Sequence, residues 1–242
     1  MDPEIRLEDP FVTAQRVRPS ANATMTGLAA NVLFYVASLG FACFDLVSIP
    51  SVGGPSATAA AAMSHRIPAE DALSVVLYVV TGLCFFQWAS RAFQAARRLG
   101  AAPKRFTARS VIWGFIIPIL NLFRPYQGLR ALDAAVDPLL VPEPPPQPET
   151  TAHAGGYRQA ALAGGGSHRE VRRPPLLGWW ALWVGGSAIG WFRGAAAHDG
   201  TALRVFDLFQ SSIQAASAAL AIVVVHRFGL LFVERARRLA AR

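Results

Sequence analysis

The chain has 242 residues, of which 53% are hydrophobic and only 16% are charged, and its net charge is +8. Globular domains carry about 25% charged residues, so this composition excludes a disordered or acidic protein and argues against an ordinary soluble domain. The basic residues flank apolar stretches, which is typical of membrane proteins rather than of nucleic-acid binders. We therefore expect an integral protein of the cell membrane that binds no nucleic acid.

An N-terminal tail of residues 1–25 precedes the first apolar segment, residues 26–49. At 1.5 Å per residue this segment makes a helix of about 36 Å, which is enough to cross a bilayer core of about 30 Å. It contains Asp45, and a carboxylate inside an apolar segment is a functional candidate by default. The competing explanation is contact with lipid headgroups, since Asp45 lies about 7 Å from the end of the segment.

The second apolar segment, residues 72–90, is expected to continue as a helix to residue 99. Gly100 is a suitable residue to end it, with Arg97 and Arg98 in the last turn. Trp88 lies near this end and Arg91 follows it. An aromatic belt at the membrane surface explains such a tryptophan, and a binding cradle is the alternative. Arg91 either packs on an aromatic ring or extends its guanidinium toward water.

The third apolar segment, residues 110–123, has only 14 residues, and Pro118 interrupts it. Such a short run is more typical of a re-entrant or in-plane segment than of a membrane span. Asn121 lies in this broken stretch, where its amide either coordinates a ligand or caps the helix itself. Residues 125–137 then form an amphipathic helix, with Asp133 and Asp137 predicted on its polar face.

A linker, residues 138–175, contains eight Pro and five Gly, and this composition predicts disorder. Two apolar segments follow, residues 176–192 and 208–225, and both are long enough to span. Gly186, Gly190 and Gly194 form a close-packing pattern, matched by Ser211, Ala215 and Ala219 in the next segment. Both are expected to be helix-packing faces, either within the bundle or between copies. The basic extension to residue 242 suits an anionic lipid surface.

The distribution of Lys and Arg favours four spans over five. With four spans and residues 110–123 returning to the cytoplasmic side, 20 of the 23 basic residues lie inside. With five spans the basic residues divide almost equally, 11 inside and 12 outside. The sequence thus predicts an all-α bundle of four transmembrane helices plus a Pro-broken segment, with both termini cytoplasmic and with five spans as the alternative.

Several short motifs occur in a fixed order in the middle of the chain. Trp88-x-x-Arg91 and Arg98-Leu99-Gly100 come first, then Trp113, then Pro118-x-x-Asn121-x-x-Arg124-Pro125-Tyr126, and finally Trp179-Trp180-x-x-Trp183. This order resembles the bacterial membrane family called domain of unknown function 4328, over roughly residues 70–230. The chain departs from the family at Gln94 and at Thr107-Ala108. The resemblance implies an integral membrane protein and supplies no chemistry.

No catalytic or cofactor-binding motif is present in the sequence, and no spacing of ligands predicts a metal site. We therefore predict a non-enzymatic structural, assembly or sensing component that contacts the bilayer, either as a single chain or as a homo-oligomer. The alternative is a small oligomeric transporter or channel that uses the segment around Pro118 and Asn121. The candidate functional residues are Asp45, Trp88, Arg91, Trp113, Pro118, Asn121, Arg124, Pro125, Tyr126, Trp179 and Trp180.

Overall fold

The computed structural model describes residues 9–48, 57–101, 103, 105–117, 120, 122–137, 175–196 and 200–241. Over these residues the fold is all-α, as predicted, with six helices. They are α1 (Pro10–Ser48), α2 (Ala57–Arg98), α3 (Ala108–Ile116), α5 (Arg124–Val136), α7 (Leu176–Ala196) and α8 (Gly200–Ala240). The predicted linker lies almost entirely outside the described residues.

Three of the six helices are long and apolar enough to cross a membrane: α1 over Pro10–Val47, α2 over Ala69–Arg98 and α8 over Val205–Ala240. In α7 the apolar stretch Leu176–Gly190 is shorter. Large apolar side chains stay exposed along these helices, which is the expected surface of a protein that faces lipid. They include Leu33, Val36, Phe44, Val47, Leu73, Val75, Val76, Val79, Leu83, Leu177, Phe209, Val223 and Leu230.

The first helix begins at Pro10, 16 residues before the predicted apolar segment. The added residues are polar overall, but Thr13, Val17 and Ala21 are buried on one face. The hydroxyls of Ser20 and Thr24 donate to carbonyls of their own helix, Val17 O and Ser20 O, both at 2.8 Å. These buried hydroxyls therefore need no partner from another helix, and residues 10–25 extend the bundle instead of forming a tail.

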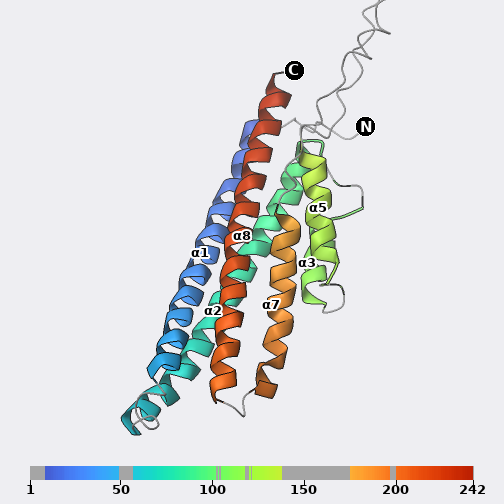
Figure 1. The fold of residues 1–242 in the computed structure, drawn as a ribbon. Coiled ribbons are helices and arrows are strands. Elements are labelled where there is room, and N and C mark those ends of the chain that lie inside the picture. The colour runs from blue at the N-terminus through green and yellow to red at the C-terminus, as the bar shows by residue number, and fades with distance from the viewer. Residues whose placement is uncertain are drawn as a thin grey trace, which may run out of the picture.

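The helices run up and down beside one another (Figure 1). Helices α1 and α8 pack together most extensively, α2 packs on α1, and α7 packs on α8. Helix α1 begins at the end of the bundle where α2, α5 and α8 finish, and this end is called the basic end below. Most of the described arginines lie on segments near this end: Arg16, Arg18, Arg91, Arg97, Arg98, Arg105, Arg109, Arg130, Arg227, Arg235, Arg237 and Arg238. Arg66, Arg193 and Arg204 lie on the parts of α2, α7 and α8 near the other end.

The predicted broken segment forms half of a helical hairpin. Helix α3 starts with a capping box, in which Ser110 N–H donates to Thr107 Oγ1 at 3.2 Å and Thr107 N–H donates to Ser110 Oγ at 3.0 Å. The helix ends at Ile116, and Ile117 is extended at φ −85° and ψ 118°. A residue before proline avoids the helical conformation, so Pro118 explains this end.

Helices α3 and α5 lie side by side because glycines make room between them. A Cβ added at Gly114 would lie 2.6 Å from Arg124 Cβ, and one added at Gly128 would fall on Val111 Cγ2. These two pairs also show that the helices are antiparallel. The nine-residue α3 reaches only about 14 Å. The chain therefore turns back toward the basic end between α3 and α5 (Figure 1).

Arginines of α8 hold this hairpin in the bundle. Arg227 pairs with Asp133 at 3.5 Å and with Asp137 at 3.9 Å. Arg235 donates to Leu99 O at 3.1 Å and to Ala135 O at 3.3 Å, at the ends of α2 and α5. Such carbonyls have no partner within their own helices. Asp133 and Asp137, predicted on the polar face of α5, are only 8% and 3% exposed, so this part of the polar face is buried against the bundle.

Many of the large side chains that are fully buried lie near the basic end. The large side chains there that are less than 2% exposed come from α2, α3, α5 and α8: Trp88, Phe93, Val111, Leu129, Leu132, Val136, Phe228 and Phe232. The interpretation of Trp88 as part of a surface aromatic belt is therefore wrong, because its side chain is fully buried. The hairpin is thus part of the core.

Candidate functional site

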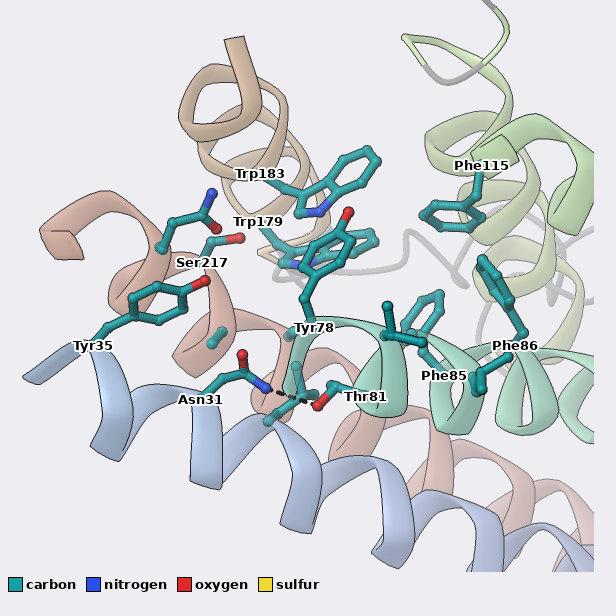
Figure 2. Close-up of a pocket in the computed structure, with 17 residues that line it drawn as sticks. Asn31, Tyr35, Tyr78, Thr81, Phe85, Phe86, Phe115, Trp179, Trp183 and Ser217 are labelled. Atoms are coloured by element: carbon teal, nitrogen blue, oxygen red, sulfur yellow. Dashed lines mark hydrogen bonds between the residues drawn. The ribbon is translucent and has the colours of Figure 1, made fainter. Parts of the chain in front are cut away.

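A groove lies between α2 and α7 in the described structure (Figure 2). Its volume is about 330 Å³, within the range of small-molecule sites. Helices α1 and α8 contribute the floor, and α3 closes one end with Phe115. The lining residues are Leu28, Asn31, Tyr35, Tyr78, Val79, Thr81, Gly82, Leu83, Phe85, Phe86, Phe115, Trp179, Trp183, Gln214, Ser217, Ala218 and Ala221.

A polar bridge between α1 and α2 forms part of the floor. Asn31 Nδ2 donates to Thr81 Oγ1 at 2.7 Å and to Gly27 O at 2.9 Å (Figure 2). The helices approach closely here, since a Cβ at Gly27 would lie 2.9 Å from Thr81 Oγ1. The two bonds use both amide hydrogens of Asn31, so its amide oxygen is the atom left to accept from a ligand.

Aromatic rings form the wall of the groove nearer the basic end. Phe115 contacts Phe85, Phe86 and Trp183, with centroids 5.4, 5.5 and 5.6 Å apart. Phe85 also contacts Trp179 at 5.8 Å. Edge-on and tilted pairs at these distances are favourable. The short helix α3 therefore places one ring between α2 and α7 and fixes the shape of the groove.

The ring contacts continue from the groove into the core. Trp88 lies 5.2 Å from Phe85 and 5.7 Å from Phe228 of α8. Tyr126 of α5 lies 5.6 Å from Trp180 of α7. Aromatic residues that are far apart in the sequence are thereby brought together in one cluster.

A family model for Domain of unknown function (DUF4328) matches residues 54–229 of the chain. The chain belongs to this family. The matched residues include α2, α3, α5, α7 and most of α8, and so all the rings of the aromatic cluster. No curated protein and no solved structure matches the chain.

The structure places the DUF4328 motif residues in different surroundings. Trp179 is buried in the groove wall and Trp180 stacks on Tyr126. Pro125 is buried in the first turn of α5, where it meets Gly114. Trp113, 48% exposed, and Arg124, also exposed, face outward. Pro118 and Asn121 lie outside the described residues.

The remaining candidates lie away from the groove. Arg91 lines a separate cleft at the basic end. Asp45 is 6% exposed in the last turns of α1, where it interacts within the protein. A third cavity, near the opposite end, is lined by Glu70, Asp71 and Asp207. No group of three or more metal-ligating side chains with metal-site geometry occurs among the described residues.

Gly186 and Gly190 of α7 pack within the bundle, against α8. A Cβ at Gly186 would lie 3.0 Å from Gln214 Nε2, and one at Gly190 would lie 3.4 Å from Gln210 Nε2. The glycines therefore make room for amide side chains of α8. Ala219, which belongs to the small-residue pattern of α8, is exposed and does not pack there. The stripe places Gln214 in the groove.

The polar residues of the groove are the ones that sequence reasoning missed: Asn31, Thr81, Gln214 and Ser217. Each is a single neutral polar residue in an apolar run, and such residues are common in membrane helices. The sequence did hold one indication of them, because the apolar segments of α1, α2 and α8 each contain at least one such polar residue near the middle. Only the packing shows that all of them face one cavity.

Proposed function

We propose that the chain is a non-enzymatic membrane protein with four spans that binds a lipid-like ligand in the groove between α2 and α7. The observation that carries this proposal is the lining of the groove. It is apolar and aromatic, with a few neutral polar groups on the floor. Among its lining residues there is no carboxylate, Lys, Arg, His or Cys, so the groove offers binding surface but no carboxylate, imidazole or thiol for catalysis.

Two observations support four spans with both termini cytoplasmic. The antiparallel hairpin of α3 and α5 brings the chain back to the basic end, so that α7 runs away from the end of the bundle toward which α2 runs (Figure 1). Helix α7 has 21 residues, or about 31 Å. Twelve of the described arginines lie near the basic end, whereas Arg66, Arg193 and Arg204 lie with Asp45, Glu70, Asp71 and Asp207 toward the other. Under the positive-inside rule the basic end is cytoplasmic.

A cysteine at Ser167, between α5 and α7, tests this topology. In a Cys43→Ala, Cys84→Ala background we expect it to be protected from a membrane-impermeant thiol reagent in intact cells and to label after permeabilisation. A cysteine between α7 and α8, at His198, is the control expected to label in intact cells. Labelling of Ser167→Cys in intact cells would contradict the four-span arrangement.

The position and shape of the groove favour a lipid-like molecule over a water-soluble one. Its lining residues belong to the apolar parts of α1, α2 and α8, so a ligand enters from the bilayer. Leu83 and Val79, which line it, are 62% and 51% exposed, so the groove is open at the α2 side. The Tyr78 hydroxyl lies beside the Trp183 indole (Figure 2) and provides a polar contact for the head of an amphiphile.

Filling the groove is expected to displace the ligand. Gly82 lines the groove, and a Cβ there meets nothing within 4 Å, so the side chain of Gly82→Phe starts in open space and its ring is expected to occupy the cavity. We expect the wild-type protein to retain dioleoylphosphatidylcholine in native mass spectrometry after detergent exchange, and Gly82→Phe to lose it with little change in Tm.

The matched control is Gly40→Phe, since Gly40 of α1 also has open space around it but does not line the groove. It should retain the lipid like the wild type. Equal retention by Gly82→Phe and the wild type would contradict lipid binding in the groove.

A transporter is the second candidate, and one arrangement favours it. Tyr35 lines both the groove and the acid-lined cavity, and Gln210 and Gln214 follow each other on one face of α8. Polar side chains thus continue from mid-membrane toward the acidic end. In proteoliposomes a transporter requires a solute flux that Gly82→Phe abolishes, whereas a binding component gives none.

A further inference from the structure

The basic end contains a second cavity of different chemistry. It lies between the N-terminal part of α1 and the C-terminal part of α2, and its volume is about 290 Å³. Three of its seven lining residues are arginines, and none is acidic. The lining residues are Thr13, Arg16, Val17, Arg91, Gln94, Ala95 and Arg98.

The arginines belong to two helices that pack together, so the cleft is built by the fold. Helices α1 and α2 run antiparallel, which places Arg16 opposite the turn that begins at Arg91. The wall of the cleft belongs to the packed core, because Thr13, Val17 and Ala95 are only 2%, 3% and 3% exposed. Arg91 is half-buried, and Arg16 and Arg98 have further interactions within the protein. Their guanidinium groups are thus attached to a packed part of the bundle.

The cleft lies at the level where the apolar surface ends. Phe85 of α2 contacts Trp179 of α7, so these two residues are level with each other. Helix α7 begins three residues earlier, at Leu176, whereas Arg91 lies six residues beyond Phe85. At 1.5 Å per residue, Arg91 is about one helical turn beyond the start of α7. In a protein that spans the bilayer, this is the depth of lipid headgroups.

We propose that this cleft binds a phosphate group, either that of an anionic lipid headgroup or free phosphate. Guanidinium groups present paired N–H donors that match phosphate oxygens, and they stay charged at all physiological pH values. Gln94 adds an amide donor. The site is separate from the groove between α2 and α7, since the two cavities share no lining residue.

The test uses the full-length protein in non-ionic detergent and measures Tm during titration with each probe. The probes are dioleoylphosphatidylglycerol, dioleoylphosphatidylcholine and inorganic phosphate at constant ionic strength. We expect phosphatidylglycerol to raise the Tm of the wild type more than phosphatidylcholine does. In Arg91→Gln the affinity for the anionic probe should fall about fivefold, since a cation near an anionic lipid surface contributes about 1 kcal/mol.

The matched control is Arg97→Gln, because Arg97 is exposed in the last turn of α2 and does not line the cleft. This variant should keep its affinity within about twofold. If inorganic phosphate raises the Tm in an Arg91-dependent manner, the site takes free phosphate. If only phosphatidylglycerol does so, it takes a lipid headgroup. Equal losses in Arg91→Gln and Arg97→Gln, or no preference for either anionic probe in the wild type, would overturn the proposal.

Discussion

Replacing Arg227 with alanine is expected to release α5 from the bundle and to lower the free energy of unfolding by about 3 kcal/mol. Arg227 is the cation that pairs with both Asp133 and Asp137, whose side chains are 11% and 4% exposed. Removing one partner of a buried pair leaves an uncompensated charge and costs about 3–5 kcal/mol. We expect a value at the lower end of this range because the Arg227 side chain is 27% exposed and water partly screens its charge.

The loss in free energy of unfolding caused by Arg227→Ala should increase as the pH rises. Burial raises the pKa of the Asp133 carboxyl above its ordinary value; Arg227 opposes this shift, and the nearby Asp137 adds to it. Without Arg227 the pKa rises further. A carboxyl whose folded-state pKa is raised favours folding below its unfolded pKa, near 4, and this contribution is lost as pH rises through the folded pKa. The deficit of Arg227→Ala should therefore be larger at neutral pH than in acid.

Hydrogen exchange over residues 124–136 and thermal unfolding at several pH values would measure this effect. Arg237→Ala is the matched control, because Arg237 is 66% exposed and its pair with Glu234 lies at the surface. It should cost less than about 1 kcal/mol. Asp133→Asn should be nearly neutral at pH 7, since it removes a costly buried charge and leaves Asp137 to pair with Arg227. Similar protection of residues 124–136 in Arg227→Ala and Arg237→Ala would contradict the role of this ion pair.

The apolar segments were predictable because the thickness and the apolar interior of a bilayer determine the length and composition of a helix that crosses it. The broken third segment also followed from local chemistry, since Pro118 forces the preceding Ile117 out of the helix. The ends of the long helices did not follow in this way. Residues 10–25 are too polar to be recognised as a span, and they are helical because small residues on one face pack against the bundle.

The main difference between prediction and structure in the hairpin concerns the surroundings of its charged residues. A periodic pattern assigns Asp133 and Asp137 to a polar face, and a polar face ordinarily meets water. Here it meets Arg227, which lies 90 residues away in sequence from Asp137. A single sequence holds no signal for such a pairing. The groove was missed for a related reason, because its polar atoms come from three different helices and only packing places them together.

Trp88→Ala is expected to have the largest effect of any single substitution considered, with a loss of about 3–5 kcal/mol in the free energy of unfolding. The side chain is 0% exposed and lies between Phe85 and Phe228, so its removal leaves a cavity where α2 meets α8. Loss of this ring also removes the support behind Phe85, which contacts Phe115 and Trp179 in the groove wall. The variant should therefore lose stability and retained lipid together.

Trp88→Phe separates packing from hydrogen bonding at the same site. The indole Nε1 of Trp88 is buried and has no hydrogen-bond partner within the described part of the chain, and an unpaired buried donor costs about 1–3 kcal/mol. Phenylalanine keeps a ring between Phe85 and Phe228 and removes that donor, so its smaller volume is partly offset. We expect Trp88→Phe to lose much less stability than Trp88→Ala.

Trp113→Ala, at a position 48% exposed, should change the free energy of unfolding by no more than about 0.5 kcal/mol. Thermal unfolding of the three variants in one detergent makes the comparison. If Trp88→Ala were as mild as Trp113→Ala, Trp88 would lie at a lipid-facing surface, and the aromatic cluster would not join α2 to α8.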